Sequence, residues 1–292
     1  MAQSALSHHI ADLEASLGLK LFERRPKGVE MTLAGRRLFE HAKAIMSALD
    51  KAEADVRTFT DEPTGPVSLG LCHTAVECVS LGVMRKVVEQ LPKVHLSLTE
   101  SMSSNLINQV LSGDVDMAVV YNPPPDGRLK SLALLKEDLY LIGHPDVIGA
   151  SHDPIAFANI PQKTVINLLP TETSRALIAS HFLRKQIAAN DILEIYSLSA
   201  LKQALVAMLG CSILAKATVG SELSTGQLHA RLIVEPKLTR ELRLVWLSEF
   251  PVMRAFLEVQ AIIASEIADV VRSGSWPGED LQRNVAAKAP GN

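Results

Sequence analysis

Cysteine is scarce in this sequence, which has only Cys72, Cys78 and Cys211 among its 292 residues. An odd number of cysteines without paired C-x-x-C spacing argues against a disulfide framework and against a structural zinc site. Adjacent His8 and His9 would point apart on a helix, so they do not form a metal-binding pair either. We therefore interpret the cysteines as small buried hydrophobic residues and expect no metal site.

Features of several other protein classes are also missing. The N-terminus has no charged-then-apolar signal segment and no apolar run is long enough to span a bilayer, so we expect a cytoplasmic protein without a membrane partner. The nucleotide-phosphate patterns G-x-x-x-x-G-K-S/T and G-x-G-x-x-G are absent. Ser199 and Lys202 fit S-x-x-K, but the companion motifs of that enzyme class are missing and no convergent catalytic set can be assembled. The sequence therefore predicts neither an enzyme nor a cofactor.

The composition favours a folded protein with one locally basic stretch. Hydrophobic residues make up 47% and charged residues 21%, so the chain can bury a sizeable core, and its length fits about two or three domains. The formal net charge is −3, yet residues 20–37 contain six basic and two acidic side chains, a local charge of +4. Such an excess suits contact with phosphate groups, although a solvated basic hairpin would have the same composition.

The first 32 residues predict a helix followed by a hairpin. Apolar residues recur at steps of four, three and four, which is the buried stripe of a helix, at Leu6, Ile10, Leu13 and Leu17. Small or short side chains occupy another face, and Gly18 would end the helix. Residues 21–22 and 29–31 flank a basic tip and read as a two-stranded wing. A helix followed by a basic wing is how winged helix-turn-helix proteins bind DNA; the alternative is a surface helix with an ordinary hairpin.

Residues 34–60 predict a second helix, with Thr32 as its N-cap. Apolar residues follow at alternating steps of four and three, the pattern of a coiled coil, and we predict that they mediate dimerisation: Leu38, Ala42, Ile45, Leu49, Ala52 and Val56. The alternative is an amphipathic helix that packs on its own domain, although such a helix usually has a broader apolar stripe.

A Pro- and Gly-rich linker at 61–66 precedes a repeated alternation of strands and helices. The pattern predicts mostly parallel sheets covered on both faces. It runs twice, with crossings expected near 139–144 and 242–247. We therefore predict one lobe from 67–142 plus about 247–272 and a second lobe from 143–246. Residues 273–292 have little apolar content and are predicted to be a disordered tail.

Several of these stretches resemble one known family. The relevant residues are Gln3-Ser4-Ala5-Leu6-Ser7, Leu13-Glu14, Leu17-Gly18, Leu21-Phe22-Glu23-Arg24 and Thr32-Leu33-Ala34-Gly35. They are similar to the DNA-reading signature of LysR-type transcriptional regulators. The resemblance implies a winged helix-turn-helix domain over residues 1–33 whose DNA contacts come from Gln3, Ser4, Ser7, His8, Arg24, Arg25 and Lys27. The family usually has arginine at the position of His8, so the base preference does not carry over.

The same family has two further helices upstream of the recognition helix. We therefore expect either a start codon assigned too late or a truncated copy, in which the apolar stripe of the first helix would lack its cover. An N-terminal region of this kind is expected to fray and to bind DNA poorly.

The two lobes resemble the periplasmic-binding-protein (type 2) architecture that LysR-type regulators use to sense an effector. Residues 91–94, 111–118 and 210–214 support this resemblance, although Ala215 replaces the family's usual proline. Hydroxyl groups and helix N-termini at the carboxyl ends of strands suit a carboxylate ligand. The residues expected to bind the effector are Thr74, Ser101, Met102, Thr171, Thr173 and Arg175. Plain helix capping remains the alternative for each of them.

Together these expectations describe an α/β protein with a partial winged helix-turn-helix, a long linker helix and a two-lobed effector domain. We interpret it as a LysR-type transcriptional regulator with a slight leaning towards nitrogen-assimilation or aromatic-catabolism regulators. Its expected partners are double-stranded DNA, a small anionic effector and RNA polymerase. We also expect it to form a homodimer or homotetramer. The alternative function is a small-molecule sensor without productive DNA binding.

Overall fold

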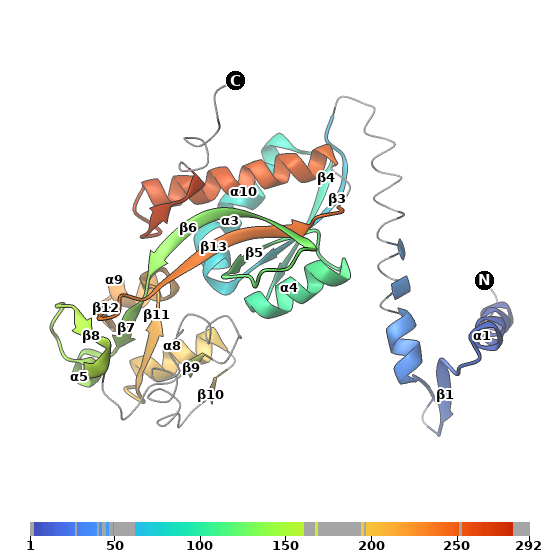
Figure 1. Ribbon diagram of the computed structural model, residues 1–292, viewed down its shortest axis with the longest axis horizontal. Helices are drawn as coiled ribbons and strands as arrows, with labels where there is room; N and C mark the ends of the chain where they lie inside the picture. Colours follow the sequence, from blue (N-terminus) through green and yellow to red (C-terminus); the bar gives the residue numbers. More distant parts are fainter. Residues whose placement is uncertain are drawn as a thin grey trace.

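The structure, a computed structural model, describes residues 3–26, 28–39, 41–42, 45–46, 49, 62–160, 167–168, 194–195, 197–250 and 253–282. These residues form an N-terminal helix and wing, a following helical segment, and two α/β lobes (Figure 1).

The N-terminal unit consists of helix α1 (Gln3–Leu17) and the antiparallel strands β1 (Phe22–Arg25) and β2 (Gly28–Met31). Gly18 follows the helix with φ of +66°, a left-handed conformation that costs glycine little because it has no Cβ. The predicted helix, its glycine stop and the wing are therefore confirmed.

The apolar stripe of α1 is largely exposed among the described residues, as the sequence predicts for a helix whose stripe lacks its cover. Leu6, Leu13 and Leu17 are 55%, 43% and 46% exposed, and Ile10 is half-buried. The wing contacts α1 on a neighbouring side of the helix, where Glu14 is buried, and it therefore leaves the stripe uncovered.

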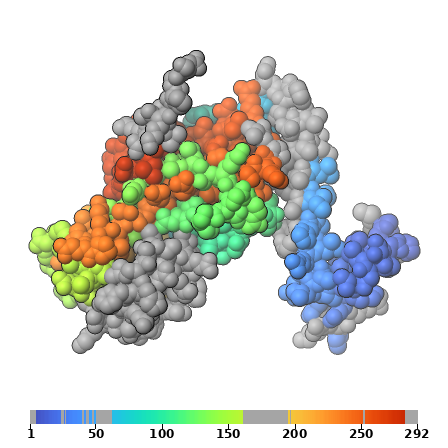
Figure 2. All heavy atoms as spheres, in the orientation of Figure 1, coloured from blue at the N-terminus to red at the C-terminus, as the bar shows by residue number. Residues whose placement is uncertain are grey.

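A helical segment follows the wing over residues 33–39 and continues through the described residues among 41–49. Of the predicted seam, Leu38 is half-buried, Ala42 is exposed, and Ile45 and Leu49 are 68% and 52% exposed. Ala52 and Val56 lie outside the described residues. Figure 2 shows α1 and this segment in blue.

The first lobe is built on a six-stranded sheet with the order β14-β6-β13-β5-β3-β4. Its strands are β3 (Gly65–Leu71), β4 (Val94–Glu100), β5 (Met117–Tyr121), β6 (Leu129–Asp138), β13 (Thr239–Leu247) and β14 (Glu279–Asp280). Strands β3, β4 and β5 are parallel, whereas β13, β6 and β14 pair antiparallel with their neighbours. The sheet is therefore mixed, which differs from the mostly parallel sheet that the sequence predicts.

Helices cover both faces of this sheet, as predicted. Helices α3 (His73–Gln90) and α10 (Arg254–Arg272) pack together on one face, and α4 (Ser103–Ser112) covers the other (Figure 1). One core connects the sheet with all three helices.

The second lobe has a four-stranded sheet with the order β11-β7-β12-β8 and a separate parallel pair, β10-β9. Its elements are β7 (Tyr140–Gly143), α5 (Pro145–Ile148), β8 (Ile155–Ala156), η1 (Phe157–Asn159), β9 (Asn167–Leu168), β10 (Glu194–Ile195), α8 (Leu198–Val206), β11 (Cys211–Leu214), η2 (Lys216–Val219), α9 (Gly220–Ser224) and β12 (His229–Val234). Two smaller cores lie within this lobe.

The chain passes between the two sheets at Leu139 and over residues 235–238. Strand β13 pairs with β6 along its whole length and with β5 over Leu242–Trp246, so it belongs to the first sheet. The sequence places this strand in the second lobe and expects the second crossing at 242–247. The difference arises because strand pairing, which periodicity does not reveal, assigns β13 to its sheet.

The predicted disorder of the C-terminal tail is wrong for residues 273–282. Trp276 is fully buried in the first lobe's core, and β14 adds a short edge strand to β6. The buried Trp276 side chain and the β14–β6 pairing together anchor a segment whose other residues are mainly polar or small. Residues 283–292 lie outside the described part.

Candidate functional site

The residues predicted to read DNA fall on α1 and the wing. Ser7 and His8 are exposed on α1, and the His8 imidazole lies 3.5 Å from the Asp12 carboxylate. Gln3 and Ser4 belong to α1, and Arg24 and Arg25 to β1, but their side chains are not among those described. Lys27 lies outside the described residues.

A buried carboxylate joins α1 to the wing. Glu14 Oε1 accepts hydrogen bonds from the backbone N–H groups of Leu21 (2.8 Å) and Phe22 (3.1 Å), and Oε2 lies 2.6 Å from Lys20 Nζ. The bond from Lys20 and those from the two backbone groups favour the ionised form, so they lower the pKa of Glu14 below its ordinary value of 4.5. Glu14 of the sequence motif therefore has a structural role, because its carboxylate fixes the position of the wing on the helix.

A second joint attaches the wing to the next helix. The Gly35 N–H donates to Thr32 Oγ1 at 2.9 Å, which confirms Thr32 as an N-cap. The Thr32 hydroxyl also donates to the Lys20 carbonyl at 2.7 Å. A Cβ on residue 35 would lie 2.0 Å from the Leu21 carbonyl oxygen, so only glycine allows this approach.

Three side chains meet where the two lobes join. Thr74 lies in the first turn of α3, Thr218 lies in η2, and their hydroxyl oxygens are 3.2 Å apart. Arg240, near the start of β13, directs Nη2 to both hydroxyls at 3.4 Å. Both threonines are buried. We call Thr74, Thr218 and Arg240 the junction triad.

Arg240 is a buried cation held by a buried anion. Its Nε lies 2.6 Å from Oε1 of Glu137, whose side chain is 1% exposed. Its guanidinium carbon lies 3.6 Å above the centre of the Tyr121 ring. Burial disfavours the charged guanidinium, but the Glu137 carboxylate outweighs this effect and raises the pKa of Arg240. The junction therefore contains a permanent positive charge.

The remaining predicted effector residues of the first lobe lie at the end of β4. Ser101 and Met102 are half-buried, and Met102 is the N-cap of α4. The Ser101 hydroxyl oxygen accepts from the Asn105 side chain at 3.4 Å. Next to them, the buried Ser103 hydroxyl oxygen accepts from the Tyr121 N–H at 3.1 Å. Thr171, Thr173 and Arg175 lie outside the described residues.

Ion pairs also connect α3 with the second lobe. Lys202 of α8 lies 2.8 Å from Glu77 of α3 and 3.7 Å from Glu222 of α9. The Lys202 side chain is 15% exposed, so these contacts are partly desolvated. Together with the Thr74–Thr218 contact they join the lobes in the conformation described.

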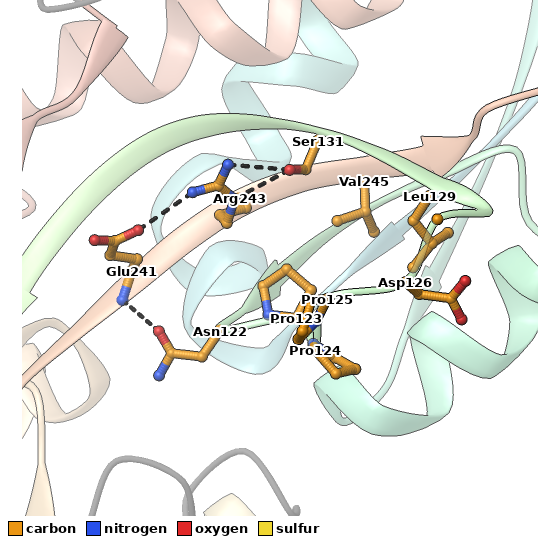
Figure 3. Close-up of a pocket in the computed structure, with 11 residues that line it drawn as sticks. Asn122, Pro123, Pro124, Pro125, Asp126, Leu129, Ser131, Glu241, Arg243 and Val245 are labelled. Atoms are coloured by element: carbon orange, nitrogen blue, oxygen red, sulfur yellow. Dashed lines mark hydrogen bonds and ion pairs between the residues drawn. The ribbon is translucent and has the colours of Figure 1, made fainter. Parts of the chain in front are cut away.

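A separate pocket of about 710 Å³ opens on the other face of β13. Side chains alternate along a strand, so Arg240 faces the junction, whereas Glu241 and Arg243 line the pocket. Figure 3 shows Arg243 pointing towards Ser131 and Glu241, with Pro123, Pro124 and Pro125 beneath. Arg243 donates to Ser131 Oγ at 3.0 and 3.2 Å and to the Glu241 carboxylate at 3.3 Å.

The three cysteines form no disulfide, and burial raises the pKa of each thiol. The pKa is raised to about 11 for Cys72, about 12 for Cys78 and about 11 for Cys211. A thiol that remains protonated at neutral pH is a poor nucleophile and a poor metal ligand. Among the described residues, no group of three or more His, Cys, Asp or Glu side chains could hold a metal ion. No helix in the described part of the chain is long and apolar enough to cross a membrane.

Comparison with known proteins agrees with both halves of this architecture. Residues 60–261 match the LysR substrate binding domain, and residues 1–36 match the bacterial regulatory helix-turn-helix protein of the lysR family. The chain belongs to the LysR family. It is therefore a DNA-binding transcriptional regulator of the LysR type with an effector-binding domain, as predicted.

Individual LysR-type relatives align with most of this chain. It is 35% identical to the nitrogen assimilation regulatory protein nac of Klebsiella aerogenes over 225 residues, 76% of this chain and 72% of that protein. It is 26% identical to the transcriptional regulator BbuR of Bordetella bronchiseptica over 95% of this chain and 85% of that protein. The similarity to nac agrees with the expected leaning towards nitrogen-assimilation regulators.

Solved structures show the same fold. A full-length OxyR variant from Pseudomonas aeruginosa superimposes with a TM-score of 0.63 and 20% identity, over 91% of this chain and 86% of that chain. An OxyR mutant from Corynebacterium glutamicum with bound H2O2 gives a TM-score of 0.61 and 21% identity, over 94% of this chain and 88% of that chain.

Sequence reasoning found one member of the junction triad, Thr74, and missed Arg240 and Thr218. It also missed Glu137, which pairs with Arg240, and Trp276, which donates a hydrogen bond to Glu137. These residues come from four distant segments, and their spacing has no pattern. The one local signal was Trp276, a large aromatic residue in an otherwise apolar-poor tail.

Proposed function

We propose that this LysR-type regulator binds a small anionic effector at the junction triad and thereby changes how its two lobes and its DNA-binding unit are arranged. The observation that supports this proposal is Arg240, a permanently charged guanidinium placed beside two hydroxyl groups that come from different lobes. A carboxylate bound there would accept hydrogen bonds from both lobes at once. Ser101 and Met102, at the end of β4, extend the same proposed site.

Binding at the junction has a direct conformational consequence. The Thr74–Thr218 and Arg240 contacts are 3.2–3.4 Å long, so they are weak bonds that an anion could replace. A ligand shifts an equilibrium only through different affinities for its states, and a site formed from both lobes provides that difference.

On the DNA side, we propose that α1 reads bases and the wing contacts phosphates. Ser7 and His8 are exposed on the helix, Arg24 and Arg25 belong to β1, and Lys27 follows them in the sequence. Replacing Arg24 or Lys27 with alanine should weaken binding to all sequences alike and lower the salt-dependence slope by about one. Replacing Ser7 or His8 should instead change the preferred bases. Selection from random DNA measures the base preference, and binding at several salt concentrations measures the salt dependence. If only the wing variants changed the base preference, the proposed roles of α1 and the wing would be reversed.

We further propose that the chain acts as a dimer or tetramer in the cytoplasm, without enzymatic activity and with RNA polymerase as its downstream partner. Two apolar surfaces support self-association. One is the linker seam. The other is the α3 stripe, formed by Leu81, Met84 and Val88, which are 65%, 42% and 73% exposed on the side of α3 opposite its buried residues.

The effector proposal can be tested with isosteric variants. Thermal shifts of the full chain are measured with a panel of small mono- and dicarboxylates, aliphatic and aromatic. For any carboxylate that stabilises the wild type, Thr74→Val and Thr218→Val should each weaken binding roughly tenfold, because each removes one hydrogen bond to a charged group.

Arg243→Gln is the matched control, since Arg243 lies on the same strand but on the opposite face. It should leave the carboxylate affinity unchanged. Loss of binding in the Arg243 variant, with normal binding in both valine variants, would place the effector in the pocket of Figure 3 instead. Absence of binding by every carboxylate would contradict an effector of this class.

A further inference from the structure

The C-terminal strap, residues Ser273–Gln282, returns from the end of α10 to the sheet of the first lobe (Figure 1). The backbone N–H of Trp276 donates to the Val270 carbonyl at 3.0 Å. Beyond it, β14 pairs with β6, and the Leu281 N–H donates to the Leu134 carbonyl at 3.1 Å. The strap is therefore attached at one end to α10 and at the other to β6, one of the two strands that lead to the second lobe.

The Trp276 indole reaches the buried ion pair behind the junction triad. Its Nε1–H donates to Glu137 Oε2 at 2.9 Å, and the side chain is fully buried. The other oxygen of the same carboxylate, Oε1, accepts from Arg240 Nε at 2.6 Å. Each carboxylate oxygen thus has its own donor, which is what a buried charge requires.

This division leaves part of the Arg240 guanidinium free for the junction. Arginine and a carboxylate prefer a bidentate pair in which two N–H groups meet two oxygens. Here Trp276 occupies Oε2, so Arg240 contacts Glu137 through Nε and directs Nη2 to Thr74 and Thr218.

We propose that Trp276 is a positioning residue for the effector site. Its indole N–H occupies Glu137 Oε2 and so prevents Glu137 from pairing with both Nε and Nη2 of Arg240, which keeps Nη2 directed at the junction. Without this N–H, Arg240 turns towards Oε2 and the contact between the lobes loosens. The functional consequence rests on the proposed effector site, whereas the geometric consequence does not.

Hydrogen exchange in the absence of any ligand tests this directly on the full chain. Two backbone N–H groups report on the junction: Val76, bonded to the Cys72 carbonyl in the first turn of α3, and Thr218, bonded to the Ala215 carbonyl in η2. The Leu106 N–H, bonded to the Met102 carbonyl in the first turn of α4, is the reference within the same lobe. Trp276→Phe removes the indole N–H and retains an aromatic ring. Val76 and Thr218 should then exchange roughly tenfold faster, while Leu106 is unchanged.

Trp246→Phe is the control, because the sequence has only two tryptophans and Trp246 packs on Phe256 away from the junction. It should change neither reporter. The indole N–H resonances identify the two residues, since each variant removes one of them.

If Trp276→Phe folds poorly, Glu137→Gln gives the same test, because a glutamine side chain has nearly the same size as glutamate and leaves no cavity. A glutamine offers only one acceptor oxygen to two donors, so both reporters should again exchange faster.

Unchanged exchange at Val76 and Thr218 in either folded variant would overturn the proposal. Equal acceleration at Leu106 would also overturn it, because it would show a loss of general stability in the first lobe. Since no effector is present, these results do not depend on whether the carboxylate panel identifies a ligand.

Discussion

At the scale of single residues, the structure assigns roles that depend on burial more than on residue type. Glu14 and Glu137 are both glutamates at the centre of hydrogen-bond networks, yet one organises the DNA-binding unit and the other the effector domain. Arg240 and Arg243 lie three residues apart on one strand, and their side chains lie on opposite faces of it. Each assignment can be tested with a single substitution.

Glu14 should make the wing joint sensitive to acid. Its folded-state pKa lies below the ordinary value of 4.5, so its stabilising effect is present above that pH and is lost as the pH falls through the lowered pKa. Glu14→Gln should remove this dependence and destabilise the N-terminal unit at neutral pH. Both effects can be measured as the protease sensitivity of residues 14–32 between pH 3 and pH 7. Asp12→Asn, which affects an exposed contact with His8, should behave like the wild type.

The cysteines should be unreactive in the folded protein. Raised pKa values of about 11 for Cys72 and Cys211 and about 12 for Cys78 leave little thiolate at neutral pH. We expect slow alkylation by iodoacetamide at pH 7.5, and fast alkylation only after unfolding. Operator binding should likewise be insensitive to mild peroxide. Rapid native-state labelling of any cysteine, located by mass spectrometry, would contradict this expectation.

At the scale of elements, the joints between helices and strands decide which sequence motifs matter. Gly35 lets the helix after the wing approach Leu21, and a Cβ at this position would overlap the Leu21 carbonyl oxygen. Gly35→Ala should therefore destabilise the N-terminal unit by roughly 1–3 kcal/mol or more, as overpacking does. Chemical denaturation with protease mapping measures the effect. At Gly127 a Cβ meets open space, so Gly127→Ala is the control and should cost little.

The linker helix should pair subunits through its seam. Ile45 and Leu49 are 68% and 52% exposed in the isolated chain, which is what an unpaired dimerisation surface would show. Replacing both with glutamate would bring like charges together in a desolvated interface, at a cost of several kcal/mol. Sedimentation velocity should then show a smaller oligomer, while circular dichroism shows folded lobes. An unchanged sedimentation coefficient would exclude the seam as an interface.

At the scale of the whole molecule, the C-terminal strap is part of the folded unit and not an appendage. Ending the chain after Arg272 would remove Trp276 from the core, together with β14 and one donor to Glu137. Losing a buried tryptophan side chain alone usually costs about 3–5 kcal/mol. We expect thermal unfolding at a much lower temperature and faster exchange along β6. A chain that ends after Gln282 retains the strap and should unfold like the full chain.

The sequence by itself determined the family, the order of domains and most of the elements. Periodicity is a local property, so the helix at 3–17, its glycine stop, the wing and the alternating strands and helices could all be read from neighbouring residues. The motif residues Glu14 and Gly35 were recognised through the resemblance to the LysR-type signature, although their physical roles were not.

Tertiary structure alone decided what those elements pack on. The membership of β13 in the first sheet and the docking of Trp276 both depend on partners far away in the sequence. The junction triad is the clearest case. The two crossings between the lobes bring Thr74, Thr218 and Arg240 together. The buried Arg240 charge is stable there because Glu137 pairs with it and Trp276 donates a hydrogen bond to the other Glu137 oxygen.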